Sequence, residues 1–137
     1  MFVDDIKSGL KQFLTAQGID VNVTDLYIYG HEIKAPEIQI GLIDDSTYEP
    51  AQTFMRETLR NMPIQIVVYS GQLKINGDKF TNYKACEHIT DLVREWIEAN
   101  KTKLGVGIIV RQSITNTMPL NSGANIYYKV MRYRVIA

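Results

Sequence analysis

The strongest structural signal in the chain is the run from Pro63 to Tyr69, which reads Pro-Ile-Gln-Ile-Val-Val-Tyr. β-Branched side chains fall on both faces of this run, and side chains of that type are enriched in strands. A strand that is apolar on both faces is typical of the interior of a sheet. The sequence therefore predicts a sheet in which residues 63–69 lie centrally.

Four further segments have the pattern of strands. Residues 26–29 form a candidate strand. Residues 37–43 alternate polar and apolar side chains and then become continuously apolar, which predicts a strand that is half-buried at one end. Residues 105–110 begin another strand, and residues 126–136 form the last one.

The closing strand changes the parity of its apolar side chains. They fall on two faces, with Ile126, Tyr128 and Val130 on one and Met131, Tyr133 and Val135 on the other. Because side chains alternate between the faces of a regular strand, we expect either a β-bulge or a switch of the buried face between Val130 and Met131.

Two segments have the periodicity of amphipathic helices. The first begins at residue 2, carries Asp4 and Asp5 in its first turn and has Gly18 as a plausible C-cap. The second runs from about residue 82 to 100, and we expect its Trp96 to be buried against the central strand. The apolar stripes are Phe2, Ile6, Leu10, Phe13 and Leu14 in the first helix and Ala85, Ile89, Leu92, Val93, Trp96 and Ile97 in the second.

These elements predict an α+β fold, in which two helices pack on one face of a mostly antiparallel sheet of four to five strands. The chain of 137 residues has the length of a single domain, residues 1–137. Asn76-Gly77 has the composition of a two-residue type I′ turn and predicts a short hairpin inserted before the second helix.

Residues 44–62 are the least regular stretch. They begin with turn-forming residues and Pro50, and no period of 2 or 3.6 persists through them. Such a length without regular structure is typical of a functional arm or a disordered loop. The alternative is that residues 53–62 form a short amphipathic helix on the protein's own core.

Composition excludes several classes of function. Lys plus Arg and Asp plus Glu both number 15, and a chain of zero net charge is a poor general binder of nucleic acid or membrane surfaces. The single cysteine, Cys86, excludes an intramolecular disulfide and a four-cysteine zinc site. Residues 1–18 contain acidic side chains and no long apolar run, so we expect no signal peptide, no spanning helix and a cytosolic protein.

Charge is unevenly distributed along the chain. Residues 1–50 hold nine acidic and three basic side chains, a net charge of −6, whereas residues 101–137 hold six basic side chains and no acid. One interpretation is that the two segments pair inside the fold. The other is that they form two surfaces of opposite sign, which suits head-to-tail contact between copies.

No constellation of residues predicts catalysis. Cys86 and His88 are two positions apart and point about 200° away from each other on a helix, so they cannot form a thiolate–imidazole pair. His31 has no partner at metal-ligand spacing, and Gly105-Val-Gly107 lacks the third glycine of a dinucleotide site. We therefore expect no catalytic residue, no metal and no cofactor.

The closing strand interleaves aromatic and basic side chains. Tyr127-Tyr-Lys129 and Arg132-Tyr-Arg134 have the pattern of a platform for single-stranded nucleic acid. The same alternation is typical of a half-buried strand with tyrosine inward and arginine outward. We favour the half-buried strand.

The order of these motifs resembles the tail terminator (tail completion or minor capsid) proteins of long-tailed bacteriophages. An N-terminal helix, two strands and an irregular arm lead to "MPIQIVVYS", the helix "NYKACEHITDLVREWIEAN" and the closing strand "YYKVMRYRV". The insertion from Gln72 to Lys79 departs from the shortest form of the pattern. The residues that match the family's central pattern are Ile64, Gln65, Ile66, Tyr83, Ala85, Ile89 and Val93.

The resemblance implies a protein that is not an enzyme. Such proteins form rings, commonly of six copies, that cap the tail tube and join it to the head–tail connector protein. It also implies a place in the virion at the tail–head interface, host cytoplasm before assembly, and no membrane or specific nucleic-acid partner. We expect the assembly interface to include Tyr48, Phe54, Met55, Arg56, Leu59, Arg60, Arg132 and Arg134.

Two alternatives remain open at this point. The chain could be the neighbouring head–tail connector, which also forms a ring. It could instead be a small bacterial ligand-binding or adaptor domain with an enclosed apolar pocket beneath the arm.

Overall fold

The computed structural model describes residues 2–26, 32–42, 49–50, 60–81, 83–101, 108–120 and 126–136. The helices are α1 (Phe2–Ala16) and α2 (Lys84–Asn100). The strands are β1 (Asn22–Asp25), β2 (Glu37–Leu42), β3 (Glu49–Pro50), β4 (Arg60–Ser70), β5 (Leu73–Ile75), β6 (Asp78–Phe80), β7 (Ile108–Ile114), β8 (Met118–Pro119) and β9 (Tyr127–Ile136).

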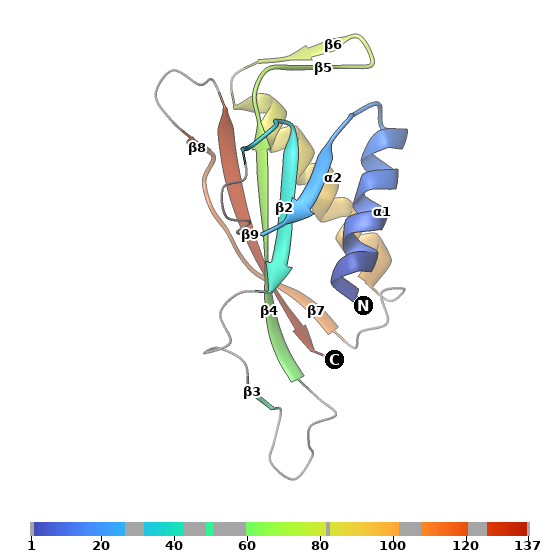
Figure 1. Ribbon diagram of the computed structural model, residues 1–137, viewed down its shortest axis with the longest axis vertical. Coiled ribbons are helices and arrows are strands. Elements are labelled where there is room, and N and C mark those ends of the chain that lie inside the picture. The colour runs from blue at the N-terminus through green and yellow to red at the C-terminus, as the bar shows by residue number, and fades with distance from the viewer. Residues whose placement is uncertain are drawn as a thin grey trace.

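The main sheet has the strand order β1-β2-β4-β9-β7, with β4 at its centre as predicted (Figure 1). The pair β1–β2 is parallel, and the other pairs are antiparallel. The two-residue strands β3 and β8 pair with β4 and β9 beyond the ends of β2 and β7. The predicted α+β class is confirmed, with a mixed sheet.

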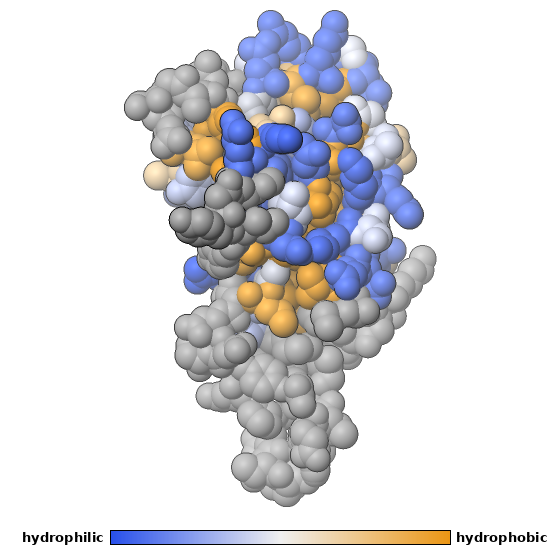
Figure 2. Space-filling view, in the orientation of Figure 1, coloured by the Kyte–Doolittle hydropathy of each residue, from blue (hydrophilic) through white to orange (hydrophobic). Residues whose placement is uncertain are grey.

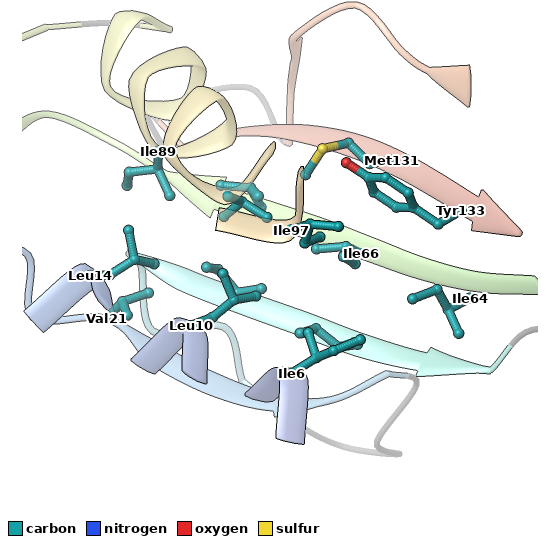
Figure 3. Close-up of a cluster of buried hydrophobic side chains, with 14 of the residues drawn as sticks. Ile6, Leu10, Leu14, Val21, Ile64, Ile66, Ile89, Ile97, Met131 and Tyr133 are labelled. Atoms are coloured by element: carbon teal, nitrogen blue, oxygen red, sulfur yellow. The ribbon is translucent and has the colours of Figure 1, made fainter. Parts of the chain in front are cut away.

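Both helices cover the same face of this sheet. α1 packs on β1 and β2, α2 packs on β4 and β9, and the two helices contact each other. Figure 3 shows their apolar side chains, among them Leu10 and Ile89, directed into one core. The strand residues on this helix-covered face are Ile38, Ile40, Ile64, Ile66, Val68, Met131, Tyr133 and Val135, all of them buried.

Glycines end α1 and turn the small hairpin as predicted. Gly18 has a φ of 87°, and the amides of Gly18 and Ile19 donate to the carbonyls of Thr15 and Leu14, which is a Schellman motif. Asn76 and Gly77 both have positive φ, as a type I′ turn between β5 and β6 requires.

The first strand lies earlier than predicted. β1 spans Asn22–Asp25, Leu26 is in the turn that follows, and residues 27–29 lie outside the described part of the chain. The gradient of burial along β2 is also opposite to the prediction. Glu37 is 1% exposed, whereas Leu42 at the apolar end is 48% exposed.

The predicted bulge in the closing strand is wrong. β9 pairs with β4 without interruption, and the register shift lies in β7 between Arg111 and Ser113. The apolar side chains do change faces at this point, which is the other alternative, although neither face of residues 127–130 is fully buried. Met131 is buried against the helices, whereas Val130 is half-buried on the opposite face.

Two further predictions need correction. The sequence places residues 60–62 in the arm or in a short helix, but they are part of β4, where residues 61–62 pair with β9 and residues 60–61 pair with β3. Trp96 is half-buried instead of fully buried against the central strand, and its indole ring lies against Gly9 of α1. The Trp96 ring therefore packs in the contact between α1 and α2.

Candidate assembly surface

The helices leave one face of the sheet uncovered, and we call it the open face. Its positions are the strand residues that alternate with the core positions, so they line up in rows across β2, β4 and β9. The rows are Glu37, Tyr69, Tyr128 and Met118; Gln39, Val67 and Val130; Gly41, Gln65, Arg132 and Ser113; and Pro63 with Arg134.

The β2 side of the open face is buried although no helix lies on it. Residues at the two described ends of the connection from β1 to the parallel strand β2 lie against this face. Leu26 lies over Gly41, where a Cβ would meet the Leu26 Cβ at 2.9 Å. At the other end, the Lys34 amide donates to the Glu37 carboxylate at 3.2 Å. This cover explains why the polar end of β2 is the buried end.

The buried carboxylate of Glu37 is held by hydrogen bonds. The Gln39 side-chain amide donates to it at 2.8 Å, in addition to the Lys34 amide. A buried charge requires such partners because it loses its hydration. Glu37 and Gln39 therefore form a buried, hydrogen-bonded polar pair on the β2 side of the open face.

The β9 side of the open face is partly exposed and mixes apolar, aromatic and basic groups. Tyr69 and Tyr128 are half-buried neighbours with ring centroids 6.1 Å apart, and Met118 beside them is 49% exposed. Tyrosine, methionine and arginine are enriched in protein–protein interfaces. We call the following residues the open-face patch: Tyr69, Met118, Tyr128, Val130, Arg132 and Arg134.

Arg132 is the oriented charge of this patch. Its Nε donates to Oε1 of Gln65 at 3.0 Å, and Gln65 is only 5% exposed. Fixing Nε at a buried acceptor sets the plane of the guanidinium, whose terminal nitrogens form the fork that binds carboxylates in a bidentate manner. The side chain as a whole is exposed. Arg132 can therefore receive an anionic group from outside the chain.

The structure describes three of the eight predicted interface residues. Arg132 and Arg134 lie together on the exposed part of the open face. The backbone of Arg60 lies in β4. The remaining predicted interface residues are outside the described part of the chain: Tyr48, Phe54, Met55, Arg56 and Leu59.

Sequence reasoning missed the apolar part of the patch. It assigns Tyr69, Tyr128 and Val130 only to strands, and Met118 to a polar loop. The parity change in residues 126–136 was the available signal, because it marks a strand with apolar residues on both faces.

Charges of opposite sign lie at opposite ends of the strand order. Exposed aspartates lie on α1, on β1 and in the connection between them, whereas β9, which carries the arginines, lies near the β7 end (Figure 1). Figure 2 shows hydrophilic side chains over the side that carries α1. We call this aspartate cluster the acidic edge: Asp4, Asp5, Asp20 and Asp25.

The ion pairs between described residues stay within their own regions. Those at the acidic edge join Lys7 to Asp4 and Asp25, and Lys11 to Asp20. None of the pairs within the described ranges joins an acid of residues 1–50 to a base of residues 101–137. The pairs elsewhere are Arg94–Asp91, Lys101–Glu98 and Lys129–Glu87. Pairing of the two segments inside the fold is therefore not observed in these ranges.

Cys86 and His88, the described side chains considered for catalysis or metal binding, pack against other parts of the fold. Cys86 is fully buried on α2, and burial raises the pKa of its thiol to about 11. His88 stacks on Phe80 with ring centroids 4.6 Å apart. His31 and residues 105–107 lie outside the described ranges. In the described part of the chain, no three His, Cys, Asp or Glu side chains converge to hold a metal.

A hollow with a volume of about 680 Å³ lies between α2 and the strands β7 and β9. Charged side chains line it, and Tyr133 contributes an aromatic ring. Burial raises the pKa of the Tyr133 phenol. The charged residues of this hollow are Asp91, Arg94, Glu95, Glu98 and Arg111.

Comparison with known proteins adds no relative. No family model matches the chain, and no curated protein matches it. Among the described residues, neither helix has the length and apolar character needed to cross a membrane.

Proposed function

We propose that this chain is a non-enzymatic structural protein of a long-tailed bacteriophage, a tail terminator. Copies of the chain form a ring that caps the tail tube and joins it to the head connector. The observation that carries this proposal is the open-face patch, in which exposed methionine and arginine side chains lie beside half-buried tyrosines on the sheet.

The order of elements supports the same proposal. A helix, two strands, the central strand β4, the helix α2 and the closing strand β9 follow one another in the order that the resemblance requires. The insertion that departs from the family pattern is the separate hairpin β5–β6, which leaves the main sheet uninterrupted. A ring of identical subunits needs two different patches on each copy. The acidic edge and the open-face patch satisfy this requirement.

The direct test is to disrupt the gene in the phage that carries it and to examine the particles by electron microscopy. A tail terminator is required for joining, so we expect full heads and separate tails. Addition of the purified protein should cap the separate tails and restore joined particles. Normal particles from the disrupted phage would contradict the proposal.

The same experiment separates the head–tail connector alternative. A connector would bind the separate heads, whereas a terminator binds the tail ends. Labelling the purified protein with gold and imaging both fractions gives the answer.

The ligand-binding alternative has one observation in its favour, the hollow of about 680 Å³ beside α2. Its lining is charged, so it suits a polar ligand better than an apolar one. Thermal shift measurements with a panel of small polar metabolites test this alternative, and a saturable rise in melting temperature would favour it.

A further inference from the structure

We infer that the partner of the open-face patch is the acidic edge of a second copy of this chain, with Arg132 facing the carboxylates around Asp20. This inference rests on the proposed function, because it names the contact by which the ring would form. It concerns the described residues of β9, α1 and β1.

Arg132 is held in place by a hydrogen bond within its own chain. Gln65 is itself buried and accepts from the Arg132 Nε, so the side chain is held with little freedom left to lose. An arginine fixed in this way gains more from a bidentate carboxylate than a freely moving one. Tyr128 and Val130 on the same strand supply the apolar surface beside it.

The aspartates of the acidic edge are exposed and only partly neutralised by lysines. The Asp20 side chain is fully exposed and lies 3.7 Å from Lys11, and the Asp25 side chain is 66% exposed. Lys11 also donates to the carbonyl of Val21, and Lys7 is shared by two aspartates. Two lysines thus face four aspartates at this edge, and the cluster keeps a net negative charge.

The two surfaces lie at different places along the strand order. The acidic edge lies at the β1 end of the sheet, and the patch lies on β9 near the β7 end. A contact between two different patches is heterologous, so a second copy that docks on the patch leaves its own patch available for a third. Repetition of the contact builds a closed ring or an open chain, and only a reciprocal pair of such contacts between two copies would close it as a dimer.

The test uses charge reversal with matched controls. Arg132→Glu alters the patch, and Asp20→Arg alters the acidic edge; both side chains are exposed. Because Arg132→Glu also removes the donor to the buried Gln65, thermal unfolding of each variant is measured first, and assembly is compared at a temperature at which all of them are folded. Lys79→Glu and Asp78→Arg in the β5–β6 hairpin make the same charge changes outside both surfaces. Assembly is measured by mass photometry and sedimentation velocity over a range of protein and salt concentrations.

We expect the wild type and both controls to form rings whose stability falls with salt. Arg132→Glu and Asp20→Arg should each raise the concentration for half-assembly by about tenfold or more, because attraction becomes repulsion. An equimolar mixture of these two variants should recover assembly. In the mixture each native patch meets a native acidic edge, and the two reversed charges attract each other where the altered surfaces meet.

The outcomes separate the inference from the proposed function. Rings of unchanged stability from Arg132→Glu, or no recovery in the mixture, would refute the inference and leave the proposed function standing. Self-association that depends on both charges, in a protein that does not cap tails, would support the inference and refute the proposed function. Saturable binding of a single-stranded oligonucleotide that requires Arg132 and ignores Asp20 would assign the patch to nucleic acid instead.

Discussion

The contact between α1 and α2 at Gly9 gives the sharpest stability prediction. A Cβ at position 9 would lie 2.2 Å from Cζ2 and 2.6 Å from Cη2 of Trp96. Carbon atoms prefer a separation of about 3.5–4.0 Å, so in Gly9→Ala the rigid indole ring must move by more than about 1 Å. Overpacking of this kind costs about 1–3 kcal/mol, and the better helix propensity of alanine returns about 1 kcal/mol.

We therefore expect Gly9→Ala to lower the free energy of unfolding by up to about 2 kcal/mol, a fall of several degrees in melting temperature. Urea unfolding followed by circular dichroism measures this change. Ser8→Ala, one position earlier and exposed, is the control and should not destabilise. In Gly9→Ala/Trp96→Leu the smaller side chain removes the clash, so the alanine should no longer be costly. Higher stability of the single Gly9→Ala variant would refute this helix–helix contact.

Three further predictions concern other sites. Gly77→Ala should destabilise by about 1–2 kcal/mol in urea unfolding, because its φ is 91° and a Cβ there meets no atom that could offset the strain. Burial raises the pKa of Cys86 from 9.0 to about 11, so stability should hold up to pH 9 and fall between pH 9 and 11, less steeply in Cys86→Ala. Gln65→Met should weaken ring assembly less than Arg132→Glu, because it frees the arginine without reversing its charge.

The elements that sequence analysis placed correctly are those with strong local signals. The central strand β4 and the helix α2 have long apolar patterns that no competing structure satisfies. The type I′ turn at Asn76-Gly77 and the Schellman motif at Gly18 depend on residues that tolerate positive φ. In each case the residues themselves restrict the backbone, so the prediction needed no knowledge of neighbouring elements.

The misplaced elements depend on distant partners. β1 contains only two β-branched residues, Val23 and Thr24, and it is a strand because it pairs in parallel with β2. The contact of Trp96 with Gly9 depends on which helix lies beside α2, and no local pattern in α2 contains that information. The bulge in β7 likewise depends on its register with β9.

The parity change in β9 links the fold to the candidate site. A strand that serves only a core has one apolar face, yet β9 presents Met131, Tyr133 and Val135 to the helices and Tyr128 and Val130 to the open face. Leu26 and the Lys34 amide lie against the β2 side of that face, whereas Tyr128 and Val130 in the second apolar set of β9 stay partly exposed. Leaving apolar surface in water forgoes about 25 cal/mol for each Å² that a partner would bury. The second apolar face of β9 therefore fits the proposed assembly, in which the helices of its own chain pack on one face and another copy binds the other.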